Sequence, residues 1–231
     1  MDATGERCYD NEKRGEMPVN ALKKIQAFLK KMLALLKKLL SKIEYNSPVT
    51  LTFSLVALLA VILGGLTGGR TTAAVFSVYR AAATDPMTYV RLFTHVFGHA
   101  DYQHFIGNIA LVLVLGPIVE EKYGTLKYIA MILVTALVSG GMHMLISGNT
   151  ALLGASGIVF MLIFAAAFTG RKTEKVPLTI VLVAILYLGG ELVDGVFVQD
   201  NISQVSHIIG GLCGIAAGAL FRSKAAKAPD A

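Results

Sequence analysis

Residues 49–69 read VTLTFSLVALLAVILGGLTGG, and this stretch decides what kind of protein the chain is. No charged side chain interrupts it, and leucine, valine, alanine and isoleucine fill most of its length. A helix needs about 20 predominantly apolar residues to cross the hydrocarbon core of a bilayer. We therefore expect residues 49–69 to form a transmembrane helix.

Further apolar stretches follow the first one. Hydrophobic residues make up 55% of the chain and charged residues 16%, whereas soluble domains are roughly 45–50% apolar and about a quarter charged. The apolar runs are long and lack the strict alternation of a transmembrane β-strand. The sequence therefore predicts an all-α membrane protein with six transmembrane helices, the other five at roughly 103–119, 125–146, 151–169, 176–195 and 203–221.

Basic residues are placed unevenly around these spans. If the N-terminus is cytoplasmic, the cytoplasmic segments hold all of the 21 Lys and Arg except Arg70, Arg80 and Arg91. Cytoplasmic loops are enriched in Lys and Arg, so this asymmetry favours six spans with both termini in the cytoplasm. The domains expected are an N-terminal segment at 1–48, a six-helix domain at 49–221 and a short tail at 222–231. We place the protein in the bacterial plasma membrane as a hypothesis.

A basic amphipathic helix is expected before the first span, at about 21–44. Leucine, isoleucine and methionine recur there at helical spacing, and lysines fill most other positions. Such a helix lies in the membrane interface rather than across it. The net charge of +6 therefore predicts anionic lipid, rather than nucleic acid, as the partner. Packing on another protein or in a short coiled coil is the alternative.

Polar residues inside a membrane span are costly and need an explanation. His104 and Asn108 are four apart on the second span, so they share one helix face. Two donors on one face could stabilise a developing oxyanion. They could equally form an interhelical hydrogen bond that only helps packing.

Two further polar groups open later spans. Gly154-Ala155-Ser156-Gly157 surrounds a serine with small residues near the start of the fourth span. On the sixth span His207 is followed by Gly210, Gly214 and Gly218 at four-residue spacing. A glycine stripe lets a neighbouring helix approach closely, which could bring His207 within hydrogen-bond reach of Ser156. Packing alone is again the structural explanation. The predicted topology places His104, Ser156 and His207 toward the same, external face.

These motifs together resemble the rhomboid family of intramembrane serine proteases, over roughly residues 89–221. The resemblance rests on His104-x-x-x-Asn108, on Gly154-Ala155-Ser156-Gly157, and on His207 with its glycine stripe. Glu120-x-x-x-Gly124 and Tyr89-Val90-Arg91 resemble two further elements of that family.

The resemblance implies a role for each matching residue. Ser156 would be the nucleophile and His207 the general base of a Ser-His dyad. His104, Asn108 and the backbone N–H of Ser156 would form the oxyanion hole. Gly154, Gly157, Phe160, Gly210 and Gly214 would support the site, with Phe160 stacking on the base. The resemblance implies no metal and no cofactor, and its substrates would be single-span membrane proteins cut within their transmembrane segments.

Three other interpretations compete with this one, and one of them is a purely structural membrane protein in which the serine, histidine and asparagine coincide by accident. A catalytically silent rhomboid-like protein would bind membrane helices without cutting them, but such proteins lack the serine or the histidine. A small transporter would favour buried charges near the midplane and matching halves. Glu191 and Asp194 are the nearest candidates for such charges, and they lie toward the outer end of the fifth span.

Overall fold

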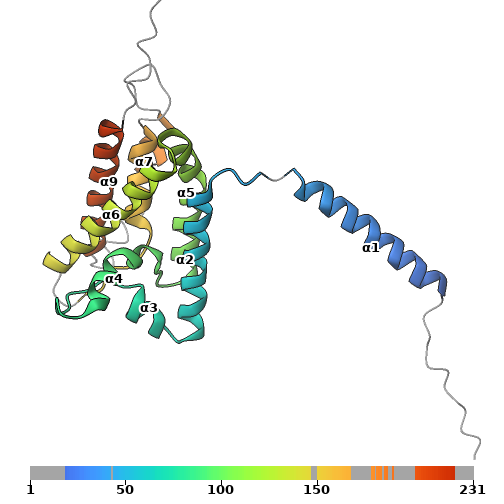
Figure 1. Cartoon of the computed structure of the whole chain (residues 1–231), viewed down its shortest axis with the longest axis horizontal. Helices are drawn as coiled ribbons and strands as arrows, with labels where there is room; N and C mark the ends of the chain where they lie inside the picture. The colour runs from blue at the N-terminus through green and yellow to red at the C-terminus, as the bar shows by residue number, and fades with distance from the viewer. Residues whose placement is uncertain are drawn as a thin grey trace, which may run out of the picture. The chain divides into compact units, whose positions relative to one another are not determined.

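The computed structural model describes residues 19–42, 44–146, 150–167 and 201–221, together with separate positions between 178 and 189. The chain divides into two units, Met1–Tyr45 and Asn46–Ala231. The first unit contains α1 (Val19–Leu40) (Figure 1). This helix begins two residues before the predicted position 21 and ends four residues before position 44, because a turn follows at 41–42. Almost all of its described side chains, apolar and basic alike, are exposed.

The second unit is built from helices (Figure 1). The elements in chain order are α2 (Pro48–Leu66), α3 (Arg70–Val75), α4 (Pro86–Thr94), the 3-10 turn η1 (His95–Phe97), α5 (Tyr102–Tyr123), α6 (Thr125–Ile146), α7 (Ser156–Ala167) and α9 (Asn201–Leu220). Extended pairing in the described residues is limited to one isolated bridge between Val78 and Leu152. The all-helical fold class predicted from the sequence is therefore confirmed.

The number of membrane spans is a separate prediction from the fold class. Among the described residues, α2, α5 and α6 are long and apolar enough to cross a membrane. The described part of α7 has 12 residues, and the apolar part of α9, Gln204–Leu220, is also short. The fifth predicted span, at 176–195, lies outside the described residues apart from separate positions. Six spans therefore remain a prediction.

The fourth predicted span begins later than expected. It was placed at 151–169, but the helix begins only at Ser156. Residues 150–154 are not helical, and Leu152 among them exchanges two backbone hydrogen bonds with Val78. Gly154 then adopts φ +128°, a conformation that a helix does not use and that favours glycine. The serine of the predicted motif is consequently the first residue of α7.

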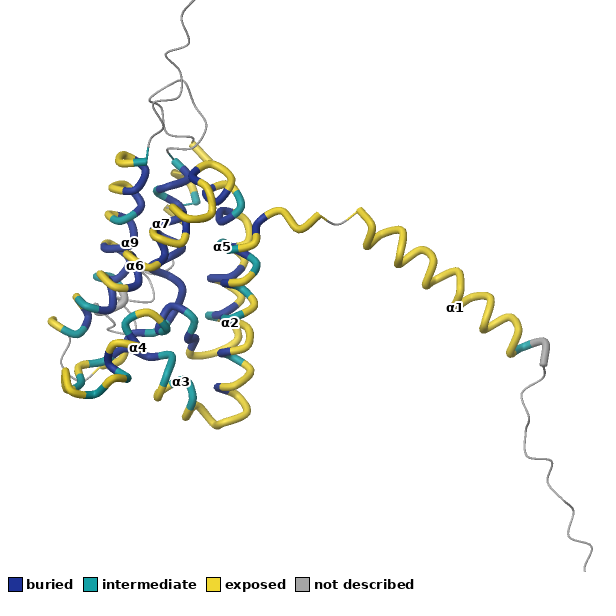
Figure 2. Tube along the Cα trace, in the orientation of Figure 1, coloured by how far each residue is buried: buried dark blue, intermediate teal, exposed yellow. Residues whose placement is uncertain are grey.

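Helix α7 forms the centre of the second unit. It packs against α5, α6 and α9, and Figure 2 shows its trace almost entirely in the colour of buried residues. The side chains of Ile158, Val159, Met161 and Leu162 are fully buried. A helix that is apolar on all faces is suited to such a central place. Because other helices surround α7, their arrangement determines how another molecule could approach Ser156.

Glu120, near the end of α5, ties that helix to the start of α2. Its carboxylate accepts hydrogen bonds from the backbone N–H of Val49 (2.9 Å) and of Thr50 (3.0 Å), and from the Thr50 hydroxyl (2.9 Å). The first N–H groups of a helix have no intrahelical partner, and a carboxylate also matches the positive end of the helix dipole. The acidic side chain of the Glu120-x-x-x-Gly124 motif therefore caps α2.

The loop between α2 and α5 is organised around Arg91, which is buried on α4. Its guanidinium donates to the carbonyl of Ala74 (2.9 Å) and pairs with Asp85 (3.1 Å). It also lies 4.6 Å from the centre of the Tyr79 ring, an arrangement suited to a cation–π contact. The hydroxyl of Tyr89 instead donates to the carbonyl of Ala83. The aromatic partner of Arg91 is thus Tyr79, a residue that the Tyr89-Val90-Arg91 motif did not single out.

Candidate active site

Ser156, the first residue of α7, meets His207 from the second turn of α9. His207 Nε2 lies 2.8 Å from Ser156 Oγ, within the range required of a nucleophile and its base. Both side chains are buried, at 6% and 3% exposure. The ring of Phe160, one turn after the serine, stacks on the His207 imidazole with centroids 4.7 Å apart and planes 17° apart. The polar contact with Ser156 and the stack on Phe160 both orient the His207 imidazole.

The short distance between these side chains depends on glycine at the helix crossing. A Cβ atom added at Gly210 would overlap the carbonyl oxygen of Gly157 and lie 2.9 Å from its carbonyl carbon. One turn later, a Cβ at Gly214 would lie 3.0 Å from the Cα of Met161. Ordinary contacts of a Cβ begin near 3.4 Å. Helices α7 and α9 are therefore closer together than any side chain at Gly210 or Gly214 would allow.

His104 lies beside the segment that leads into Ser156. A Cβ atom added at Gly154 would lie 2.9 Å from His104 Cε1 and 3.0 Å from Nε2, so the imidazole packs directly on this glycine. Asp101 caps α5 by accepting the backbone N–H of His104 (2.8 Å). Asn108 is buried one turn further along, and its amide donates to the His104 carbonyl (3.1 Å). Both residues of the predicted pair thus lie on α5, and His104 borders the serine motif.

The first turn of α7 adds donors of its own. Backbone N–H groups at the start of a helix lack intrahelical acceptors, and they carry the positive end of the helix dipole. Ser156 is the first residue of α7. An anion that formed at the serine would therefore meet backbone donors of this turn.

His95 and His99, on the loop between α2 and α5, are buried near this region. The His95 carbonyl accepts the N–H of Gly154 (3.0 Å), and its ring lies 3.4 Å from the Ser139 hydroxyl on α6. The His99 ring contacts His104 edge-on, with centroids 5.1 Å apart. Burial lowers the pKa of His95 to about 4, and burial with the nearby His104 lowers that of His99 to about 4. Both are therefore neutral at physiological pH.

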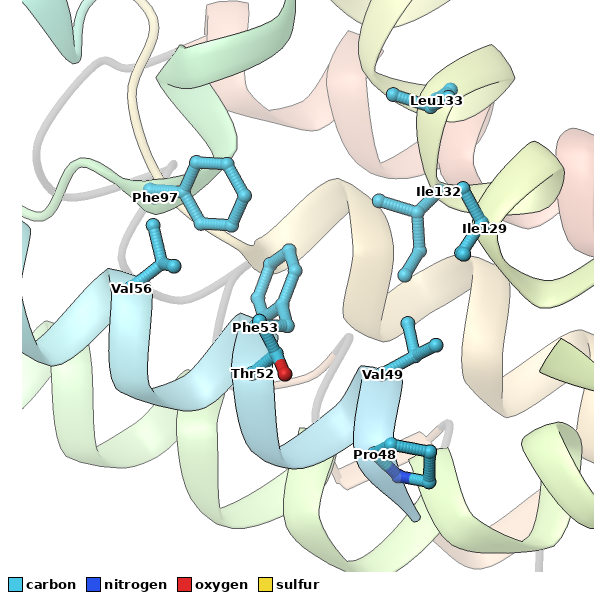
Figure 3. A pocket seen from close by; sticks show the side chains of 9 residues that line it. All are labelled: Pro48, Val49, Thr52, Phe53, Val56, Phe97, Ile129, Ile132 and Leu133. Atoms are coloured by element: carbon cyan, nitrogen blue, oxygen red, sulfur yellow. The ribbon is translucent and has the colours of Figure 1, made fainter. Parts of the chain in front are cut away.

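Other features of the second unit lie apart from this site. An apolar groove of about 360 Å³ runs between α2 and α6 beneath Phe97 (Figure 3). None of the residues singled out from the sequence lines it. The described residues contain no cluster of His, Cys, Asp and Glu able to hold a metal ion. Glu191 and Asp194, weighed as candidates for a transport site, lie outside the described residues.

Comparison with known proteins shows which family the chain resembles. A rhomboid domain is matched over residues 86–224, which includes Ser156, His207, His104 and Asn108. The chain belongs to the rhomboid family. The resemblance drawn from the sequence motifs is therefore confirmed.

Curated proteins named rhomboid protease GlpG also match the chain. Those of Salmonella newport (strain SL254), Salmonella heidelberg (strain SL476) and Salmonella choleraesuis (strain SC-B67) are each 29% identical to it over 178 residues. The alignment covers 75% of this chain and 63% of each relative. The chain thus spans about 63% of the length of the curated relatives that it matches.

Two anchors near the serine escaped the sequence analysis. Val78 pairs with Leu152, and the His95 carbonyl binds Gly154, so the loop between α2 and α5 holds the chain just before Ser156. Backbone contacts of this kind leave no mark on the residue types involved, and Val78 carries no recognisable signal. His95 and His99 are evident in the sequence, but their spacing does not reveal that the His95 carbonyl binds Gly154 or that the His99 ring contacts His104.

Proposed function

We propose that this rhomboid protein is an intramembrane serine endopeptidase with Ser156 as nucleophile and His207 as general base. The single observation that carries the proposal is the 2.8 Å contact between Ser156 Oγ and His207 Nε2, buried at the start of α7. The curated relatives named rhomboid protease support the same activity. A silent binder needs neither the serine nor its base, and nothing in the described residues favours a transporter.

The chemistry follows from the dyad. His207 Nε2 takes the hydroxyl proton as Ser156 Oγ attacks the scissile carbonyl, and the resulting oxyanion accepts hydrogen bonds from His104, Asn108 and the backbone N–H of Ser156. His207 then gives its proton to the leaving amine, which breaks the peptide bond and leaves an acyl-enzyme. Water, deprotonated by His207, hydrolyses this ester and restores the serine. A buried imidazole stacked on Phe160 needs no carboxylate to fix its orientation in this scheme.

The substrates of the proposed reaction are transmembrane segments of single-span proteins. A helix in a membrane has its backbone groups hydrogen-bonded within itself, so a peptide bond must leave the helix before Ser156 can attack it. Glycine and proline weaken helices by about 1 and 3 kcal/mol per residue. Segments with such residues near the cleaved end should therefore be cut in preference to uniform leucine-rich helices.

The location belongs to the same proposal. The distribution of Lys and Arg favours an N-terminus and a C-terminus in the cytoplasm, which puts the dyad toward the outer face of a bacterial inner membrane. Polar residues near that face can line a cavity that water enters. Such a cavity would supply the water that hydrolysis consumes.

The test of the activity uses purified protein in liposomes with a tagged single-span substrate that carries a helix-weakening residue near its outer end. Cleavage by the native chain is compared with Ser156→Ala and His207→Ala, and each protein is also treated with a fluorophosphonate probe that labels reactive serines. We expect both variants to lose cleavage and labelling. Equal cleavage by either variant would assign the activity to a contaminant, and an unlabelled native protein would favour the silent binder.

Helix α1 has a separate role in the proposal, as an anchor on anionic lipid. Its lysines and its exposed leucines alternate at helical spacing along Val19–Leu40, which is the composition of an interfacial helix. The chain has no tryptophan, so Phe28→Trp introduces a unique fluorophore on α1. Its emission should shift to the blue in nanodiscs that contain phosphatidylglycerol, and less in phosphatidylcholine. An identical spectrum in both lipids would contradict the role of charge.

A further inference from the structure

The segment 150–154 leads into Ser156 and makes hydrogen bonds to other described residues at three of its positions. Leu152 exchanges two backbone hydrogen bonds with Val78, at 2.8 and 2.9 Å. The N–H of Gly154 donates to the His95 carbonyl. The third point is the carbonyl of Thr150, which lies 3.0 Å from His143 Nε2. The first two contacts are between backbone groups, so the third is the one that depends on a particular side chain.

His143 is well placed to hold this carbonyl. A carbonyl oxygen only accepts, so His143 Nε2 carries the hydrogen and donates it to Thr150. The imidazole is buried, at 3% exposure, and it lies on α6 close to the end of that helix. Arg80 fixes the same helix end, because its guanidinium donates to the carbonyls of Met144 (3.1 Å) and Leu145 (2.7 Å). The helix end that carries the donor to Thr150 is therefore itself held in place by Arg80.

These contacts alternate along the segment. Thr150, Leu152 and Gly154 are bonded to α6 and to the loop between α2 and α5. The backbone groups of Ala151 and Leu153 make no backbone hydrogen bond within the described residues, so they leave one edge of the segment unpaired there. An edge of this kind is where an extended peptide is recognised. The contacts of His143 and its neighbours therefore set the shape of an edge that runs directly to Ser156.

We propose that His143 is a positioning residue that holds the upstream half of this edge in the form that binds substrate. The inference rests on the proposed protease function. Two anchors, at Leu152 and Gly154, lie between Thr150 and the nucleophile. Losing the bond to Thr150 therefore loosens the edge without moving Ser156. A binding segment that adopts its competent form only part of the time weakens affinity by that fraction, so the effect falls on KM rather than on kcat.

The experiment compares His143→Phe with the native chain in liposomes. Phenylalanine keeps an aromatic ring in the buried site but removes the donor. We expect KM for a single-span substrate to rise about three- to tenfold, the range of one net hydrogen bond, with kcat and the rate of fluorophosphonate labelling within about twofold of native. His143→Gln places an amide donor at a similar reach and should restore KM. Met142→Leu, at the neighbouring, exposed position, is the matched control.

A second variant covers the case in which His143→Phe does not fold. Arg80 is exposed, and Arg80→Gln removes the bonds that secure the end of α6. It should raise KM in the same direction by a smaller factor. An unchanged KM in the folded variants overturns the inference, as does a KM increase that comes with an equal loss of labelling. Absence of labelling in the native protein would instead overturn the proposed protease function.

Discussion

The crossing of α7 and α9 offers a sharp test of how the dyad is assembled, through the substitution Gly210→Ala. The added methyl group would lie 2.9 Å from the carbonyl carbon of Gly157 and closer still to its oxygen, whereas ordinary contact begins near 3.4 Å. The helices must therefore separate by at least 0.5 Å, the difference between these two distances. Both partners are backbone, so no side chain can move aside to relieve the overlap.

This separation acts directly on the reacting groups. The 2.8 Å contact between His207 and Ser156 would lengthen to about 3.3 Å or more, beyond the reach of an efficient base. A misplacement of about 1 Å costs about 100-fold in rate. We expect kcat/KM of Gly210→Ala to fall by about 10- to 100-fold in the liposome cleavage assay.

The control is Gly141→Ala on α6, where an added Cβ meets no atom within 4 Å. It replaces glycine by a better helix former, so it should keep native activity and a native or higher thermal midpoint. The fluorophosphonate labelling rate of Gly210→Ala should fall in parallel with cleavage. Native cleavage and labelling by Gly210→Ala would refute the reasoning, because the dyad would then tolerate a wider crossing.

Three further predictions concern stability, the base and pH. Glu120→Ala leaves buried N–H groups at the start of α2 without acceptors, so it should lower the free energy of unfolding by about 2–4 kcal/mol. The change is measured as a lower thermal midpoint in detergent, and a midpoint equal to that of the native protein would exclude a capping role. Phe160→Leu removes the stack on His207 and should lower kcat about three- to tenfold with little change in KM, and a change confined to KM would contradict this. Because burial lowers the pKa of His95 and His99 to about 4, the unfolded chain binds more protons than the folded one between pH 6.5 and 4. Stability should therefore be full above about pH 6.5 and fall as the pH drops through this window, by up to about 3 kcal/mol for His95. Equal midpoints at pH 7 and pH 4.5 would show that neither histidine titrates there.

Much of the fold could be predicted because the membrane imposes strong rules on the sequence. The hydrocarbon core demands long apolar helices, and the predictions at 49–69, 103–119 and 125–146 fall on α2, α5 and α6. The family could be recognised because several motifs occur in the right order along the chain. The start of the fourth span was wrong, since an apolar stretch such as ALLGA at 151–155 has the same hydropathy whether it is extended or helical.

The candidate site was predictable only in part. The dyad residues carry chemistry that stands out within apolar spans, and a glycine stripe signals a close crossing by itself. Two other contacts could not be predicted in this way, because each joins residues that only the folded loop brings together. They are the cation–π contact of Arg91 with Tyr79 and the backbone hydrogen bonds between Val78 and Leu152. Local pattern cannot specify contacts between distant segments when one of the partners is an ordinary valine or a backbone carbonyl.

For the proposed protease, the separation of the two dyad residues along the chain has a consequence for when activity can begin. Ser156 and His207 are 51 residues apart, on helices α7 and α9. A polypeptide is made from its N-terminus at about 5–20 residues per second, so the serine enters the membrane several seconds before its base is synthesised. During that interval a half-inserted chain carries a serine without a base and is inactive. Under the proposed function, neighbouring helices in the same insertion machinery would not be cut during that interval, and proteolysis would begin only when α9 docks against α7.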